Sequence, residues 1–411
     1  MTTLQVLSVL FATAALFGML SRSWLRLPVT IGTMLLTVIV SMVLASARSF
    51  APGLHAWASD FALHIDFQSI ILHGMLPLLL FAGAFLLDIE QLAREKLAVS
   101  ILAIAGTVAS TFAVAALMFL GSGFQLSWLQ CLVFGALISP TDPIAVLEML
   151  RRAGVSKAVR AQLAGESLFN DGIGAVLFLG MLQLAEGGHS TPLHLALTLI
   201  LKSGGAVLLA IVAAWVVSTL MRRVEAYQVD ILFTIALALG GYVLADLLHL
   251  SGPLEAVVAG IALRIFNRRQ ASHRVAHEQI DRFWEVIDEI QNSVLFVLLG
   301  LETLVIPIDW TNLRNGVSAI VSVNLVRFVA VAGILLLVRA VRRDHMSSVF
   351  VLTWGGLRGG LSIALALSVP EALGRSWMLS ATYLVVVFSV LLQGASMNWL
   401  LHRLQHRQLP V

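Results

Sequence analysis

The chain has 411 residues, of which 59% are hydrophobic and only 12% are charged. Soluble proteins carry about 25% charged residues, so this composition excludes a water-soluble globular protein and predicts a polytopic membrane protein. The net charge of +3 gives no reason to expect nucleic acid as a partner, because the basic residues follow the sides of the membrane.

Hydropathy and the positions of glycine, proline and charged residues predict about thirteen spans in one membrane domain, residues 1–411. The first span has no basic residue before it, so we interpret it as a membrane helix and not as a cleaved signal peptide. No connection between spans is long enough to form a soluble domain. In chain order the predicted spans are 4–21, 28–46, 68–88, 97–120, 128–149, 162–184, 195–221, 229–247, 252–267, 284–301, 314–339, 346–368 and 377–402.

The lysines and arginines outside the spans lie mainly in loops that follow odd-numbered spans, and the even-numbered loops hold only Arg48, Arg314 and Arg375. Cytoplasmic loops of membrane proteins are enriched in basic residues. This distribution predicts an amino terminus outside and a carboxyl terminus in the cytoplasm. We therefore expect a multi-pass protein of the cell (inner) membrane, with the lipid bilayer as its surroundings.

Two predicted spans contain residues that interrupt a helix. The fifth contains Ser139-Pro140-Thr141-Asp142-Pro143, and each proline removes a backbone donor. The twelfth contains Gly355-Gly356-Leu357-Arg358-Gly359-Gly360, and glycine also disfavours a regular helix. The interruptions occupy corresponding places in spans 1–6 and 8–13, which predicts two inverted six-helix repeats with broken helices near the middle of the membrane.

The sixth span contains Gly165-Glu166-Ser167-Leu168-Phe169-Asn170-Asp171-Gly172 inside an apolar segment. Polar side chains are costly in hydrocarbon and usually serve a function there. On a helix, Ser167 and Asp171 share one face, and Glu166 and Asn170 share a neighbouring face. The hydroxyl and carboxylate of the first face suit a small cation, and the second face suits a partner helix. The alternative is a purely structural polar contact between helices.

Five ionisable residues lie deep in the predicted spans: Asp142, Glu166, Asp171, Arg327 and Arg358. A buried Arg358 needs an anion, and we predict Glu166 as its partner, with the Asn170 amide sharing the guanidinium. Asp171 is then left without a fixed cation. Such a carboxylate can hold a proton or a sodium ion, but not both, and this competition is the physical basis of antiport.

Three further acidic residues have open interpretations. Asp288 and Glu289 lie on an amphipathic segment, residues 283–292, and either line an acidic cytoplasmic funnel or face water at that end. Glu255 begins the ninth span and leaves the predicted site intact, but its role at the outer mouth is not assigned.

Three motifs resemble those of NhaP-type sodium/proton antiporters in the monovalent cation:proton antiporter-1 family, which also contains the eukaryotic sodium/hydrogen exchangers. They are Thr141-Asp142-Pro143, the Gly-Glu-Ser-x-x-Asn-Asp of residues 165–171 and Gly-Gly-Leu-Arg-Gly-Gly of residues 355–360. The similarity covers nearly the whole chain, because it extends to Leu86-Leu87-Asp88, Phe283-Trp284-Glu285, Asn292-Ser293 and Gly300-Leu301-Glu302.

The resemblance implies an all-α, NhaA-like fold in which broken helices 5 and 12 cross. Core helices are expected at roughly 97–184 and 314–402, and the remaining helices are expected to form a dimerisation domain. It also implies a sodium site made by four residues: Asp171, Ser167, Thr141 and Asp142. A structural knot beside that site is expected from four others: Glu166, Asn170, Arg358 and Arg327.

The resemblance further implies exchange of cytoplasmic sodium or lithium for external protons, for pH and sodium homeostasis, by a homodimer without a cofactor. Related antiporters that move two protons per sodium carry aspartate in place of Asn170. The neutral amide at this position therefore predicts electroneutral, one-for-one exchange.

Several other functions remain as alternatives. A potassium/proton antiporter on the same scaffold is the main one, because oxygen ligands alone do not separate sodium from potassium. An intramembrane aspartyl protease would use Asp142 and Asp171, but neither lies in a Gly-x-Gly-Asp setting, and a protease leaves the Arg358 segment unexplained. Ser167 does not lie in the Gly-x-Ser-Gly of an intramembrane serine protease. A channel fits broken helices in inverted halves less well than alternating access does.

Overall fold

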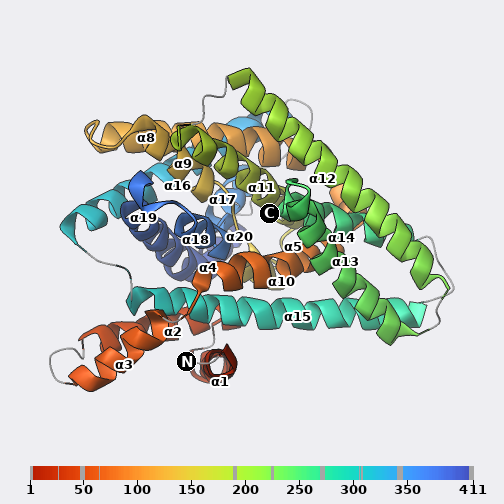
Figure 1. Cartoon of the computed structure of the whole chain (residues 1–411), viewed down its shortest axis with the longest axis horizontal. Helices are drawn as coiled ribbons and strands as arrows, with labels where there is room; N and C mark the ends of the chain where they lie inside the picture. Colours follow the sequence, from red (N-terminus) through yellow and green to blue (C-terminus); the bar gives the residue numbers. More distant parts are fainter. Residues whose placement is uncertain are drawn as a thin grey trace.

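The computed structural model of the chain describes residues 3–25, 27–46, 51–63, 65–187, 192–223, 226–268, 274–304, 306, 309–339 and 346–406. These residues form helices and connections, without a strand among them (Figure 1). The α-helices are α1 (Thr3–Leu20), α2 (Val29–Ser46), α3 (Pro52–Leu63), α4 (Phe67–Ser69), α5 (Leu76–Phe85), α6 (Ile89–Arg94), α7 (Lys96–Ser100), α8 (Thr107–Gly121), α9 (Trp128–Ile138), α10 (Ile144–Arg152), α11 (Lys157–Ala185), α12 (Pro192–Met221), α13 (Tyr227–Leu247), α14 (Gly252–Arg268), α15 (Arg274–Leu301), α16 (Trp310–Arg339), α17 (Met346–Gly355), α18 (Gly360–Leu367), α19 (Arg375–Val387) and α20 (Ala395–His406).

The predicted multi-pass membrane protein is confirmed. Among the described residues, nine helices are long and apolar enough to cross a membrane, and the bent pair of α17 and α18 adds a tenth. Each predicted span contains helix, but three do not meet that test. The fifth is broken and its α9 has 11 residues, the ninth has 17 residues in α14, and the tenth lies in the charged helix α15. The number thirteen therefore stays a prediction.

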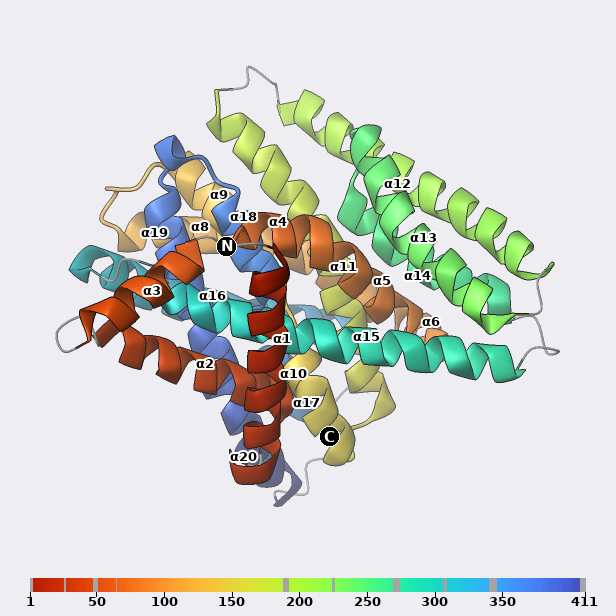
Figure 2. The ribbon, with the colours of Figure 1, turned by 60° about the horizontal axis from the view of Figure 1, so that its bottom comes forward.

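Two helix groups each have an apolar core of their own, and a larger core joins α1, α2 and α15 to α10, α11 and α16–α20. One core is shared by α8, α9, α11, α16, α18 and α19 and includes the buried Phe134 and Phe178. The other is shared by α5 and α12–α15 and is centred on Phe81, Phe85 and Trp284. Helices α12 to α14 form a layer at one side, and α1 crosses α15 (Figure 2). The division into a core and a dimerisation domain stays a prediction.

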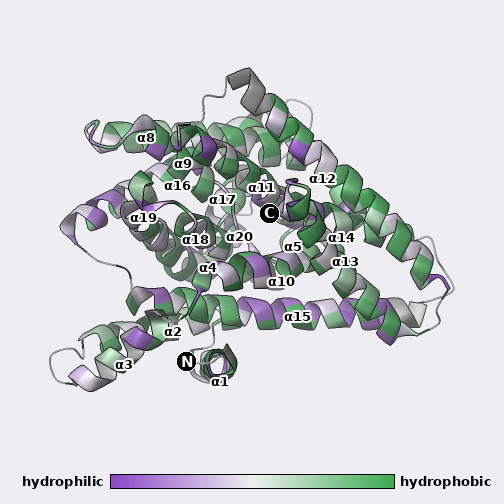
Figure 3. Ribbon diagram, in the orientation of Figure 1, coloured by the Kyte–Doolittle hydropathy of each residue, from purple (hydrophilic) through white to green (hydrophobic). Residues whose placement is uncertain are grey.

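The outer surface and α15 differ in polarity. Most helices are hydrophobic along their length, whereas α15 carries a hydrophilic stretch (Figure 3). Large apolar side chains are exposed on the outer helices, for example Leu201 on α12 and Leu247 on α13. Lipid covers such surfaces at no cost, so the exposed apolar faces agree with a membrane-embedded chain.

Both predicted helix interruptions are present. Residues 139–143 are non-helical between α9 and α10, and residues 356–359 are non-helical between α17 and α18. The second broken span bends by 42° at its break. The breaks touch each other, because the backbone N–H of Asp142 donates to the Leu357 carbonyl oxygen at 2.8 Å. This contact brings the motifs of spans 5 and 12 to one place.

Candidate functional site

The break between α9 and α10 frees backbone groups, and side chains from other spans bind them. The Arg358 guanidinium donates to the carbonyl oxygens of Ser139 and Pro140, at 2.6 and 2.7 Å. The Thr141 N–H donates to Oδ1 of Asn170 at 3.1 Å. Unpaired backbone groups are costly in hydrocarbon, so these side chains are what allow the helix to break inside the membrane.

Charged side chains lie at the half-helix ends with the signs that the helix dipoles favour. Arg358 contacts the carbonyls at the carboxyl end of α9, and Oδ1 of Asp142 accepts from the N–H of Ile144 at the start of α10, at 3.0 Å. Asp142 also packs against Gly359, just before α18, where a Cβ would lie 2.9 Å from the Asp142 Cγ. Helix amino ends favour anions and carboxyl ends favour cations, so these two side chains offset the exposed helix ends.

Two residues of α11 bind Thr141. The hydroxyls of Ser167 and Thr141 share a hydrogen bond of 2.7 Å, and the Asn170 Nδ2 donates to the Thr141 Oγ1 at 2.8 Å. The predicted contact of Asn170 with the Arg358 guanidinium is therefore wrong. The amide nitrogen of Asn170 donates and its oxygen accepts, which matches the hydroxyl and the N–H of the unwound Thr141 opposite it.

The partner of Glu166 is Arg327 on α16, and not Arg358 as predicted. Both terminal nitrogens of Arg327 donate to the carboxylate, with Nη2 to Oε2 at 2.9 Å, and the pair is buried. Gly356 provides the space, because a Cβ there would lie 2.6–2.8 Å from the guanidinium. Arg358 is engaged with the carbonyls of the other break, and the described residues contain no ion pair between it and Glu166.

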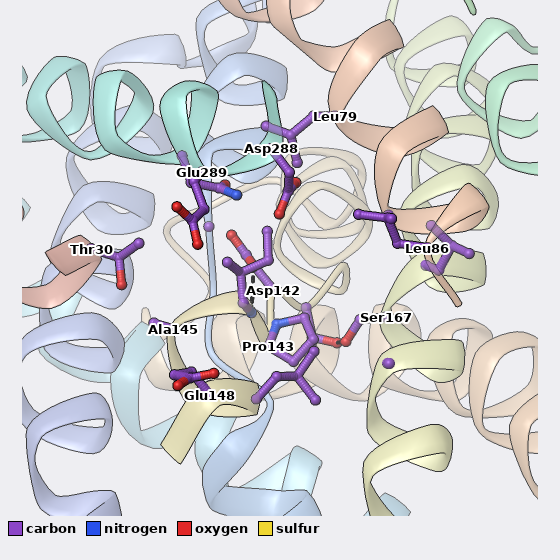
Figure 4. Close-up of a pocket in the computed structure, with 18 of the residues that line it drawn as sticks. Thr30, Leu79, Leu86, Asp142, Pro143, Ala145, Glu148, Ser167, Asp288 and Glu289 are labelled. Carbon is purple, nitrogen blue, oxygen red and sulfur yellow. Dashed lines mark hydrogen bonds between the residues drawn. The ribbon is translucent and has the colours of Figure 1, made fainter. Parts of the chain in front are cut away.

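A cavity of about 1050 Å³ reaches this region. Four of its lining residues are those of the predicted sodium site: Thr141, Asp142, Ser167 and Asp171. Figure 4 shows Asp142 and Ser167 among the residues that line it. The lining also includes basic residues of loops that are predicted to be cytoplasmic: Arg22, Arg151, Arg152, Lys157 and Arg160. The structure thus brings the four predicted ion ligands to one water-accessible space.

Asp171 differs from its neighbours in having no hydrogen bond from any described residue. Ser167 is bound to Thr141, and one oxygen of Asp142 is bound to a backbone N–H. The Asp171 carboxylate lies within electrostatic range of Asp142 and Arg358 and faces the cavity. Its oxygens are therefore available to a proton or to a small cation.

The four knot residues surround a different space. Glu166, Asn170, Arg327 and Arg358 line a cavity of about 10 Å³, which is room for about one water molecule. The two faces of α11 that the sequence spacing predicted therefore line two separate cavities. Ser167 and Asp171 face the large cavity, and the other pair faces the buried knot.

Glu255 lies outside the walls of both cavities. Its side chain is 0% exposed, and in the described part of the chain neither carboxylate oxygen has a hydrogen-bond partner. The carboxylate packs directly against Gly241 of α13. Glu255 is thus part of the packing between α13 and α14, which its position in the sequence did not indicate.

Comparison with known proteins identifies the family. Residues 10–403 match the family described as sodium/hydrogen exchanger, transmembrane. The chain belongs to the sodium/hydrogen exchanger family. It is 38% identical over 412 residues to the Na(+)/H(+) antiporter NhaP of Pseudomonas aeruginosa, covering 98% of this chain and 97% of that protein. It is 32% identical over 348 residues to the Na(+)/H(+) antiporter NhaH of Halobacillus dabanensis, covering 82% and 84%.

A solved structure has the same fold. The sodium proton antiporter MjNhaP1 from Methanocaldococcus jannaschii superposes with a TM-score of 0.76 at 20% identity, covering 98% of this chain and 99% of that one. A sodium/hydrogen exchanger is a transporter and not an enzyme. The alternative of an intramembrane protease built on Asp142 and Asp171 is therefore wrong.

Proposed function

We propose that this member of the sodium/hydrogen exchanger family exchanges cytoplasmic sodium or lithium for external protons, one for one, across the cell membrane. The names of its relatives support sodium and protons as the transported ions. The observation that carries the proposal is the carboxylate of Asp171. It faces the large cavity, beside the bonded hydroxyls of Ser167 and Thr141, and none of the described residues donates a hydrogen bond to it.

The proposed ion site offers oxygen ligands only. Asp171 supplies the charge that a proton and a sodium ion compete for, and Ser167 and Thr141 supply neutral oxygens beside it. Asp142 faces the same cavity and contacts the ion directly or through a water molecule. Hard cations prefer oxygen ligands of this kind. Because one carboxylate holds one ion at a time, loading sodium releases the proton.

The knot supports this exchange by keeping its own charges fixed. Glu166 is neutralised by Arg327, and Asn170 is an uncharged amide bound to Thr141. Neither residue is then available to carry a second proton. This supports one-for-one exchange, in which each step of transport moves the same net charge.

The large cavity is the proposed cytoplasmic path to the site. Basic residues from the loops that the positive-inside rule assigns to the cytoplasm line it, among them Arg22 and Lys157. Alternating access would then move the helices that carry Asp142 and Asp171 relative to the second helix group. A homodimer would hold that second group in place in the bilayer.

Proton movement in everted membrane vesicles tests the proposal. Respiration acidifies the vesicles, and added sodium or lithium is expected to release protons from those that contain the wild-type protein. Vesicles with Asp171→Asn at equal expression serve as the control and should not respond. A response to potassium alone would favour the potassium/proton antiporter, and a lack of response to all three ions would overturn the proposal.

A further inference from the structure

Helix α15 presents a polar face to the large cavity. Asp288, Glu289, Asn292 and Ser293 all line it. Figure 4 shows the carboxylates of Asp288 and Glu289 directed toward Asp142 across this space, and Asp288 lies within electrostatic range of Asp142. The cavity is therefore bounded by acidic side chains on two opposite walls, one from the broken span and one from α15.

The facing carboxylates of α15 have no fixed counter-ion among the described residues. In the described part of the chain, no ion pair joins Asp288 or Glu289 to a basic side chain. Five basic residues also line the cavity. Arg151 and Arg152 are paired with Glu148, and in the described part of the chain Arg22, Lys157 and Arg160 form no ion pair with Asp288 or Glu289. Like charges that face each other across a cavity repel unless a cation lies between them. The space between Asp142 and the two α15 carboxylates therefore favours a mobile cation.

Asn292 gives an independent indication of a ligand. It follows Asp288 by one helical turn and is 1% exposed. Its amide lies beside the Asp288 carboxylate, yet neither amide atom makes a hydrogen bond of acceptable geometry among the described residues. Buried amides nearly always have partners. An unbound amide oxygen on the wall of a water-accessible cavity is a suitable ligand for a hard cation.

We propose that Asp288 and Asn292 form a second cation site, which binds sodium on the α15 wall before it reaches Asp171. This inference rests on the proposed sodium/proton exchange. The Asp288 carboxylate supplies the charge, and the Asn292 carbonyl supplies a neutral oxygen one turn away.

The location of the second site gives it a distinct role. Just before Asp288, α15 packs in the core of α5 and α12–α14. Its residues 294–299 pack in the larger core that also contains α10 and α11. A cation that leaves Asp288 for Asp142 therefore passes from the α15 wall to the break between α9 and α10. The second site sets the apparent affinity for cytoplasmic sodium, and Asp171 sets coupling to the proton.

Kinetics in everted vesicles test this division of roles. Asp288→Asn is expected to raise the sodium KM about tenfold, as loss of one charge at a partly hydrated site would. Asn292→Ala should raise KM in the same direction, and Asp288→Glu should restore it. The maximal rate at saturating sodium should stay within about twofold of wild type, because the proton carrier is untouched.

Glu285→Gln is the matched control, since Glu285 lies one turn earlier on α15, is exposed and does not line the cavity. Its KM should equal that of wild type. An unchanged KM in both Asp288→Asn and Asn292→Ala would overturn the second site. Loss of exchange at saturating sodium in a folded Asp288→Asn protein would also overturn it, because the residue would then act as a carrier. If Asp288→Asn fails to fold, the KM of Asn292→Ala decides the question.

Equilibrium binding separates this proposal from the proposed function. Purified Asp171→Asn protein should still bind radioactive sodium, and adding Asp288→Asn should remove that binding. Absence of such binding would overturn the second site even if wild-type vesicles exchange sodium for protons. Conversely, absence of exchange in both wild type and Glu285→Gln would overturn the proposed function, and the binding measurement would still decide on the site.

Discussion

Arg327 on α16 binds Glu166 on α11 through both terminal nitrogens of its guanidinium. The second of these nitrogens also donates to the carbonyl oxygen of Leu352 in α17, at 3.0 Å. One side chain thus joins three helices beside the break of span 12. Arg358 has a different task, because its guanidinium binds the carbonyls at the end of α9.

Breaking the Glu166–Arg327 pair is expected to cost about 3–5 kcal/mol of stability, because the remaining charge stays buried. Arg327→Ala should therefore lower the melting temperature in detergent. Glu166→Gln combined with Arg327→Ala should cost less than the sum of the single changes. A second double-mutant cycle, Glu166→Gln with Arg358→Ala, is the control, and its combined effect on stability should lie closer to the sum of the single effects. Additivity in the first cycle together with coupling in the second would contradict the pairing.

Asp171→Asn is expected to abolish sodium-driven proton movement while the protein still inserts and folds. The amide keeps the shape of the side chain but cannot exchange a proton for a cation. Fluorescence of a pH-sensitive dye in everted vesicles measures the exchange, and size-exclusion chromatography checks folding. Asp142→Asn should impair exchange severely. Measurable coupled exchange by Asp171→Asn would show that another group carries the proton.

Exchange should be insensitive to membrane voltage. One carboxylate alternates between one proton and one sodium ion, since Asn170 is neutral and Glu166 is held by Arg327. Sodium-driven proton exchange in proteoliposomes, with the potential set by potassium and valinomycin, measures this. A clear change of rate on imposing a potential would mean that a second group titrates, and Asp142 would be the first candidate because it is coupled to Asp171.

Gly241→Ala is expected to destabilise the protein by about 1–3 kcal/mol through overpacking, because the new Cβ would overlap the buried Glu255 carboxylate. Gly240→Ala on the same helix is the control. A Cβ there would meet nothing within 4 Å, so the melting temperature should stay the same or rise. Glu255→Ala added to Gly241→Ala should recover stability. Equal melting temperatures for the two glycine variants would show that the carboxylate moves aside freely.

The local parts of the site could be predicted from the sequence, and its long-range pairings could not. Prolines in residues 139–143 and glycines in residues 355–360 act on their own backbone, so both breaks were predictable. The i, i+4 spacing likewise predicted the two faces of α11. The partner of Glu166 depends on how α16 packs against α11, and spacing within one helix contains no such information. Gly356 was the available signal, because it leaves space for Arg327.

The number of spans was harder to predict for a related reason. Hydropathy measures one helix at a time, whereas α14 and α15 are stabilised by contacts with other helices. α15 begins at Arg274, about ten residues before the predicted start, and its charged first half includes Asp281, which pairs with Arg264 of α14. The sequence also could not predict that the Asn292 amide is buried without a hydrogen-bond partner among the described residues, since this is a property of the packed structure.

Backbone N–H groups at the two helix breaks are hydrogen-bonded, and this allows the motion of the transporter to be tested by hydrogen exchange. The N–H groups of Thr141, Asp142 and Arg358 lie in the non-helical segments, and they donate to Asn170, Leu357 and Ser389 respectively. Bonded, buried amides exchange with deuterium only when the structure opens locally. If the two broken spans move together as a rigid body during transport, these amides should exchange as slowly as those of α9 and α17. Rapid deuterium uptake confined to the two breaks would instead mean that transport proceeds by local unfolding.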